Sequence, residues 1–249
     1  MSFFKRLFKA TAKYIKKKKE LCCTAVIVAA GSASRMQGTD KIMAPLAGAP
    51  LILRTVRVFQ EHPSIKDIVV VTREDLVEEI SRLCKANNFD KVRSVVTGGA
   101  DRSHSVAIGL ANAPEYTTHV AIHDGARPLV CPEVIESVVR KAMQTGAAAP
   151  AVPVKDTVKI ARGGLVIDTP NRAELYAVQT PQVFDIDLLR GALDHAVGKG
   201  IPITDDCSAV EKIGMRVHLV EGSEENIKIT TPIDLTVADA ILRNRGEIS

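Results

Sequence analysis

The stretch "AVIVAAGSASRMQGTDK", residues 25–41, decides the fold of this chain of 249 residues. It opens with an unbroken apolar run, which is typical of a strand covered on both faces of a parallel sheet. The chain then passes through very small residues and, within a dozen positions, supplies two cations, Arg35 and Lys41. Small residues let backbone N–H groups approach a bound anion, and the cations neutralise phosphate oxygens. The stretch therefore predicts a phosphate-binding turn after a buried strand, although a solvated surface turn would share these residue types.

The pattern of a short apolar strand followed by a helix then repeats along the chain. Further strands are expected at residues 66–72, 92–97 and 118–124, and helices at 50–61, 73–88 and 105–110, with later ones opening at Pro132 and Thr231. Such alternation predicts right-handed βαβ units in a Rossmann-like α/β fold, an open and mostly parallel sheet flanked by helices. Ligands in these sheets bind beyond the carboxyl ends of the strands, where the opening loop lies.

Residues 152–172 interrupt this alternation. They read "VPVKDTVKIARGGLVIDTPNR", with strand-like alternation on both sides of Gly163 and Gly164, the residue pair of a tight hairpin turn. No helix follows to cover the hairpin, and a two-stranded hairpin alone is marginally stable. We therefore expect a protruding β-hairpin arm, about residues 152–175, that packs on a second copy of the chain as a homodimer.

The positive charge is concentrated at the start of the chain. Residues 1–20 hold eight Lys or Arg and one Glu, a net of +7, so the other 229 residues carry −3 of the total of +4. We expect a tail over residues 1–21 and a single domain over 22–249. A basic tail on a near-neutral body argues against a nucleic-acid-binding domain, which would carry its positive charge on the folded surface. The tail fits a basic amphipathic helix on an anionic membrane, but a solvated terminus is the preferred interpretation.

The sequence shows neither the pattern of a secretory signal nor an apolar run of the ~20 residues that span a bilayer. The five cysteines lack the spacing of a zinc site, and Cys22, Cys23 and Cys84 fit small core residues. A cytoplasmic enzyme without cysteine-bound metal is the expectation.

Further polar stretches follow the predicted strands. "TGGADRSHSV" offers the Gly98-Gly99 turn and the Ser105 hydroxyl for reading the edge of a base. "IHDGARP" ends a strand with Asp124, a carboxylate that can bind a ribose hydroxyl or help to hold Mg²⁺, and then supplies Arg127. Each of these residues alone also fits a turn residue, a helix cap or a surface cation. The order of the motifs along the chain is therefore more informative about function than any one of them.

That order runs AAG-x-x-x-R-M, K, GG-x-x-R-x-x-S-V, HD-x-A-R-P, V-x-D-T-x-K, R-x-x-L-x-x-x-QTPQ, TDD and N-x-K-x-T. Over about residues 23–245 it resembles the cytidylyltransferases of the non-mevalonate isoprenoid pathway. The resemblance implies that CMP is transferred from CTP, with Mg²⁺, to 2-C-methyl-D-erythritol 4-phosphate, which gives 4-diphosphocytidyl-2-C-methyl-D-erythritol and pyrophosphate.

The resemblance also implies roles for individual residues. Charge on the reacting phosphates would be stabilised by Arg35, Lys41, Arg172 and Lys228. The nucleotide would be held by Ala29, Ala30, Gly31, Ser32, Gly98, Gly99, Ser105 and Asp124. The CTP phosphates would hold most of the Mg²⁺ coordination, with Asp124 as the candidate protein ligand. The methylerythritol phosphate would be placed by Arg127, Thr157, Arg172, Thr180 and Lys228, some of them reaching in from the partner's arm.

The chemistry agrees with this assignment. The nucleophile is a phosphate oxygen that is already ionised, so no general base is required. Two like unit charges about 4 Å apart repel by about 4 kcal/mol at an effective dielectric constant near 20. Bringing a phosphate against a triphosphate therefore calls for fixed cations and Mg²⁺.

The chain departs from the family pattern at Ala33, Asp40, Ile42 and Ala100. An acid at Asp40, beside Lys41, would weaken CTP binding unless it pointed away, and Ala100 leaves part of the base contact in doubt. Three alternatives stay open: a ribitol-5-phosphate cytidylyltransferase, a transferase that uses UTP or GTP, and a catalytically inactive scaffold. The stretches at residues 154–159 and 172–182 favour the isoprenoid enzyme over the ribitol one, and the cations oppose the scaffold.

Overall fold

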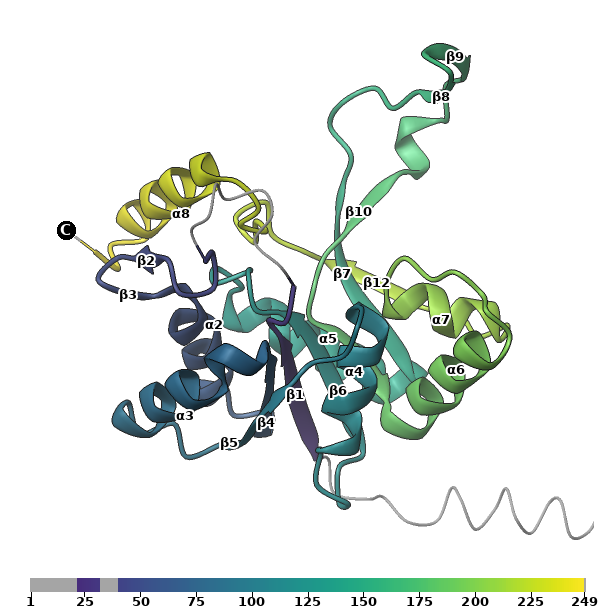
Figure 1. The fold of residues 1–249 in the computed structure, drawn as a ribbon. Helices are drawn as coiled ribbons and strands as arrows, with labels where there is room; N and C mark the ends of the chain where they lie inside the picture. Colours follow the sequence, from purple (N-terminus) through teal and green to yellow (C-terminus); the bar gives the residue numbers. More distant parts are fainter. Residues whose placement is uncertain (1–21, 32–39, 249) are drawn as a thin grey trace, which may run out of the picture.

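The computed structural model describes residues 22–31 and 40–248. Its centre is an eight-stranded sheet (Figure 1) with strand order β10-β7-β11-β6-β1-β4-β5 and β12 beside β7. The strands are β1 Cys23–Val28, β4 Ile65–Thr72, β5 Val92–Thr97, β6 His119–Asp124, β7 Ala147–Pro153, β10 Tyr176–Val178, β11 Gln182–Asp185 and β12 His218–Glu221. The pairs β1–β4, β1–β6, β4–β5 and β7–β12 are parallel, whereas β11 runs antiparallel to β6 and β7, and β10 to β7. The open, mostly parallel sheet expected from the sequence is confirmed.

Helices cover both faces of this sheet (Figure 1). One face carries α2 Leu51–Glu61, α3 Val77–Ala86 and α5 Pro132–Thr145, and the other carries α4 Arg102–Ala111, α6 Ile186–Gly198 and α7 Asp206–Lys212. Each face of the sheet has its own hydrophobic core, and alternate residues of β1 point into the two cores. Ile27 packs in the core beneath α2, α3 and α5, and Val26 in the core beneath α4, α6 and α7. This double burial is why the opening run has no polar interruption. Cys22, Cys23 and Cys84 are buried, as expected.

The helix boundaries follow local signals in the sequence. Pro132 is the first residue of α5, as predicted. The predicted helix at residues 73–88 is divided into a 3₁₀ turn, η1 Glu74–Leu76, and α3. The last helix, α8 Pro232–Asn244, starts where the Asp234 carboxylate accepts hydrogen bonds from the N–H groups of Thr230 and Thr231, at 2.7 and 2.8 Å. It packs with the short strand β2 Pro45–Leu46, which pairs with β3 Ala49–Pro50.

Between β7 and β10 the chain forms an arm that projects from the sheet (Figure 1). Its tip pairs β8 Ile160–Arg162 with β9 Leu165–Asp168. Gly163 and Gly164 join them with φ values of +57° and +81°, the left-handed conformations that a type I′ hairpin turn requires. The short 3₁₀ helix η2 Arg172–Glu174 lies between β9 and β10, where the chain returns to the sheet. The expected hairpin is therefore present.

The tail expected at residues 1–21 lies outside the described residues. Within the part of the chain that is described, no helix has both the length and the apolar character needed to cross a membrane.

Candidate active site

A cavity of about 390 Å³ lies at the carboxyl ends of β1 and β6. Most of the residues predicted to hold the nucleotide meet here, although they come from five separate stretches of the chain. The predicted residues that line the cavity are Ala29, Ala30, Gly31, Lys41, Gly99, Ser105, Asp124 and Lys228. Ser32 and Arg35 lie outside the described residues.

The loop after β5 closes one wall of the cavity through tight packing. A Cβ atom at Gly98 would stand 2.4 Å from the Cβ of Ala30 and 2.8 Å from the Oγ of Ser105, so only glycine fits. The Ser105 hydroxyl accepts a hydrogen bond from the Gly99 N–H at 3.1 Å and donates one to the Asp101 carbonyl at 2.9 Å. The hydroxyl expected to read a base edge thus fixes the shape of this loop.

Asp124 lies at the centre of the electrostatics. Its carboxylate is 2.9 Å from Lys228 Nζ, 3.5 Å from Arg127 Nε and 3.8 Å from Arg102 Nε. Burial raises the pKa of Asp124, but the attraction of Lys228, then of Arg102 and Arg127, outweighs it and brings the pKa down to about 2. Asp124 is therefore ionised at neutral pH.

A chain of hydrogen bonds holds Asp124 from behind. The Thr180 hydroxyl accepts from the Asp124 N–H at 3.1 Å and lies 3.0 Å from His123 Nδ1, while His123 Nε2 lies 3.0 Å from the Arg127 carbonyl. A carbonyl can only accept, so Nε2 carries the proton and Nδ1 accepts from Thr180. Burial lowers the pKa of His123 to about 4, which keeps the ring neutral. The resemblance implied that Thr180 contacts the acceptor, whereas its buried hydroxyl is directed at the Asp124 backbone.

The N-x-K-x-T motif positions Lys228. The Asn226 side chain donates to the Thr180 carbonyl at 2.9 Å, and the Asn226 carbonyl accepts from Arg127 Nη1 at 2.6 Å. Ile229 N–H donates to the Ala126 carbonyl at 2.8 Å, so Lys228 is anchored on both sides. Arg127, expected to bind the acceptor phosphate, does not line the cavity and instead links these segments.

Two predicted residues lie on the arm and not at the cavity of the same chain. Thr157 and Arg172 are both exposed, and Arg172 Nη1 donates to the Lys155 carbonyl at 2.8 Å. The base of the arm is tied to the body by an ion pair of 3.0 Å between Lys155 and Glu224. One chain alone therefore does not bring these two residues together with Lys41 and Lys228.

Comparison with known proteins decides the family. A sequence profile of the 2-C-methyl-D-erythritol 4-phosphate cytidylyltransferases matches residues 23–244. The chain belongs to this family. A relative of that name from Desulforamulus reducens is 48% identical over 228 residues, which cover 89% of this chain and 96% of the relative. Another from Bacillus velezensis is 45% identical over 220 residues, 88% and 94% of the two chains.

Solved structures agree with the sequence comparison. The 4-diphosphocytidyl-2C-methyl-D-erythritol synthase from Anaerococcus prevotii superposes with a TM-score of 0.81 at 30% identity, covering 90% of this chain and 99% of that one. This chain is thus a cytidylyltransferase of isoprenoid biosynthesis, with CTP as its co-substrate. The ribitol phosphate, other-nucleotide and scaffold alternatives are not favoured.

The structure accounts for two departures of this cytidylyltransferase from the family pattern. The negative charge of Asp40 is paired with Arg73, because Asp40 Oδ2 lies 2.5 Å from Arg73 Nη2. Asp40 Oδ1 accepts a hydrogen bond from the Ile42 N–H at 2.9 Å. The Ile42 side chain is buried in the core beside α2. Ala100 lines the cavity, and Ala33 lies outside the described residues.

Sequence reasoning missed two charged residues of the site, Arg102 and Asp206. Arg102 lines the cavity, and its Nη2 lies 2.7 Å from Oδ2 of Asp206, whose side chain is fully buried. Burial raises the pKa of Asp206, and the attraction of Arg102 opposes that rise. Both residues belong to motifs that the sequence shows, Arg102 to GG-x-x-R and Asp206 to TDD. They lie far apart in the chain, and no sequence pattern predicts that they form an ion pair.

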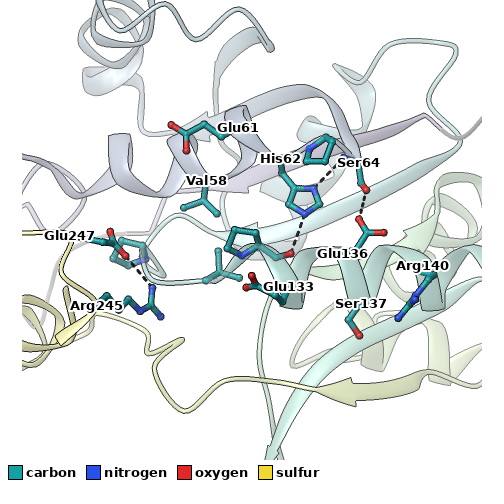
Figure 2. Close-up of a pocket in the computed structure, with 14 residues that line it drawn as sticks. Val58, Glu61, His62, Ser64, Glu133, Glu136, Ser137, Arg140, Arg245 and Glu247 are labelled. Carbon is teal, nitrogen blue, oxygen red and sulfur yellow. Dashed lines mark hydrogen bonds and ion pairs between the residues drawn. The ribbon is translucent and has the colours of Figure 1, made fainter. Parts of the chain in front are cut away.

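A larger cavity, about 860 Å³, lies between the end of α2 and the first half of α5 (Figure 2). None of the predicted site residues lines it. Several of its polar groups are paired within the protein: Ser64 donates to Glu136 at 2.5 Å, His62 Nε2 lies 3.1 Å from the Pro132 carbonyl, and Arg245 lies 3.6 Å from Glu247 (Figure 2). Size alone would select this cavity, but the convergent cations and the small-residue loop select the other.

Proposed function

We propose that the smaller cavity transfers CMP from CTP to 2-C-methyl-D-erythritol 4-phosphate by charge stabilisation and positioning alone. A phosphate oxygen of the acceptor forms a bond to the α-phosphorus of CTP, the bond between that phosphorus and the bridging oxygen breaks, and pyrophosphate leaves. The observation that carries the proposal is the convergence of Lys41, Arg102 and Lys228 on a loop of small residues at the end of β1.

The described residues of the cavity suit a reaction without proton abstraction. Asp124, with a pKa of about 2 and three cations around it, is a poor base at neutral pH. His123 is fully buried and its Nδ1 already accepts from Thr180. The acceptor phosphate is ionised in solution, so the barrier is charge repulsion, which preorganised cations lower.

In this proposal Arg35, Lys41, Arg172 and Lys228 stabilise charge on the reacting phosphates. Residues 29–32, with Gly98, Gly99, Ser105 and Asp124, hold or shape the nucleotide site. Arg127 and Thr180 act from behind, by orienting Asp124 and Lys228, while Thr157 and Arg172 complete the acceptor site.

Mg²⁺ fits the residues that are present. Among residues 22–31 and 40–248 no group of three or more His, Cys, Asp or Glu side chains gathers to hold a metal ion. Mg²⁺ commonly uses one or two carboxylates and otherwise binds water and substrate phosphates. Asp124 and the triphosphate would hold the ion, which would neutralise charge on the phosphates.

The arm supports a homodimer. On β9, the side chains of Leu165, Val166 and Ile167 are 75%, 60% and 56% exposed, a large apolar surface for a two-stranded tip. A second copy that covers this surface would also carry Thr157 and Arg172 of one arm toward the cavity of the other protomer. A cytoplasmic location stays a prediction from the sequence.

The test is pyrophosphate release from each of the four nucleoside triphosphates, with Mg²⁺, in the presence of methylerythritol phosphate or ribitol 5-phosphate. Turnover with CTP and methylerythritol phosphate is expected. Preference for ribitol phosphate, or for another nucleotide, would overturn the substrate assignment, and no release with any pair would overturn catalysis.

A further inference from the structure

A buried ion pair joins the first residues of two helices. Arg102 begins α4 and Asp206 begins α7, and their charged groups meet at 2.7 Å. The Asp206 side chain is fully buried, and its Oδ1 accepts no hydrogen bond from the described protein atoms. Arg102 is the cation that compensates this carboxylate. A buried carboxylate that loses its cation is strongly destabilising, so the two residues act as a unit.

The same guanidinium forms part of the cavity wall. Arg102 Nε lies 3.8 Å from Asp124 Oδ1, and 31% of the Arg102 side chain is exposed. Arg102 therefore stands between two carboxylates, one buried behind it and one inside the cavity. Five N–H donors in a rigid plane allow it to keep Asp206 and still present other donors to an anion.

Asp206 itself is held rigidly. The Gln182 side chain donates to Asp205 Oδ2 at 2.7 Å and accepts from the Cys207 N–H at 3.1 Å, which fixes the residues on both sides of Asp206. Gln182 belongs to β11, and it pairs with Ile122 of β6, two residues before Asp124. The start of α7 is thus tied to the strand that carries the cavity carboxylate.

We propose that Asp206 is a positioning residue: it holds the Arg102 guanidinium at the cavity wall so that Arg102 binds the nucleotide of CTP. The inference rests on the proposed function. Without Asp206, Arg102 would keep Asp124 and Asp205 as nearby carboxylates. Asp205 already accepts hydrogen bonds from the Gln182 side chain and the Ser208 N–H, so Arg102 would swing toward Asp124. That movement would remove a donor from the nucleotide and occupy the group assigned to Mg²⁺.

The closing experiment compares Asp206→Asn with Asp67→Asn. Asp67 is a matched control, since it is also a fully buried carboxylate paired with an arginine, Arg93, but lies toward the opposite end of β4 from the cavity. Asp206→Asn should lower kcat/KM for CTP by 10- to 100-fold and change KM for the acceptor less than threefold. Asp67→Asn should lower the melting temperature and leave both kinetic constants unchanged.

A double-mutant cycle with Arg102→Ala separates positioning from stability. If Asp206 acts through Arg102, the double variant should be no worse than Arg102→Ala alone. Asp206→Glu, which keeps the charge but displaces it, should also lower kcat/KM for CTP, and it serves if the Asn variant does not fold. Wild-type kcat/KM in both Asp206 variants, or fully additive losses, would overturn the inference while wild-type turnover sustains the proposed function. An inactive wild type would instead overturn the proposed function.

Discussion

Asp124 and His123 are adjacent residues, yet the folded protein keeps Asp124 charged and His123 neutral. Asp124 faces three cations and keeps its charge, whereas His123 lies among apolar groups, 4.7 Å from the Phe59 ring by their centroids, and stays neutral. The neutral ring is what lets Nδ1 accept from Thr180 and so fix the Asp124 backbone. Protonation of His123 would put a hydrogen on Nδ1, so Nδ1 could no longer accept the hydrogen bond from the Thr180 hydroxyl.

The pH dependence of stability follows from these two groups. The pKa of His123 is about 4 in the folded chain and that of Asp124 about 2, both below their ordinary values of 6.5 and 3.8. The unfolded chain therefore binds protons first as pH falls. The free energy of unfolding should fall from about pH 6.5 to 4 through His123, and again below about pH 4 through Asp124.

Denaturant unfolding at pH 7, 5.5 and 4.5 measures this effect. A His123→Gln variant should be less stable than the wild type at pH 7, because it loses packing, but its stability should decline less steeply with acid. His62 and His119, whose pKa values burial also lowers, are present in both proteins and do not affect the comparison. Equal slopes for the two proteins would contradict the role given to His123.

At the scale of elements, the loop between β5 and α4 depends on close packing. Gly98→Ala would force a Cβ into the Cβ of Ala30 and the Oγ of Ser105, so the loop must move. We expect a loss of about 1–3 kcal/mol of unfolding free energy, the usual range for overpacking, together with a higher KM for CTP.

Gly191→Ala in α6 is the control for this substitution, since nothing lies within 4 Å of a Cβ at that helical position. It should stabilise the chain by up to about 1 kcal/mol without altering kinetics. Thermal unfolding and initial rates measure both variants. A Gly98→Ala enzyme as stable and active as the wild type would show that the loop does not shape the nucleotide site.

The elements that the sequence predicts best are those with a clear local signature. Strands β1, β4, β5 and β6 are β-branched runs, and the hairpin has a Gly-Gly turn, so local chemistry identifies them. Strand β7 reads AAAPAVP, with little β-branching and two prolines, and only its pairing with β10, β11 and β12 makes it a strand. The same holds for the cavity. The sequence predicts its loop residues from their local motifs, but it does not predict the ion pair between Arg102 and Asp206, which are distant in the chain.

At the scale of the whole molecule, we propose that the arm determines assembly into a dimer. Deletion of residues 159–168 removes both strands of the arm tip and their apolar surface. Sedimentation should show a dimer for the full chain and a monomer for the shortened one. A dimer that survives the deletion would place the interface elsewhere on the molecule.

Arg172 tests whether the arm also contributes to the acceptor site. Since Arg172 lies on the arm and does not line the nucleotide cavity, Arg172→Ala should raise KM for methylerythritol phosphate at least tenfold more than KM for CTP. Steady-state kinetics with each substrate varied in turn measures the difference. Equal effects on both substrates would argue against its assignment to the acceptor.

We propose that fixed cations, and no proton-abstracting residue, allow the two repelling phosphates to react. The most direct test is the steady-state rate of Lys41→Ala with CTP and methylerythritol phosphate, with Arg35→Ala beside it and Lys85→Ala on the exposed end of α3 as the control. We expect kcat to fall by about 100-fold or more for the first two variants, the scale of losing one preorganised stabilising group, and to stay unchanged for the control. An unchanged kcat with only a higher KM would mean that these cations bind the ground state and do not stabilise the transition state, which would contradict the account.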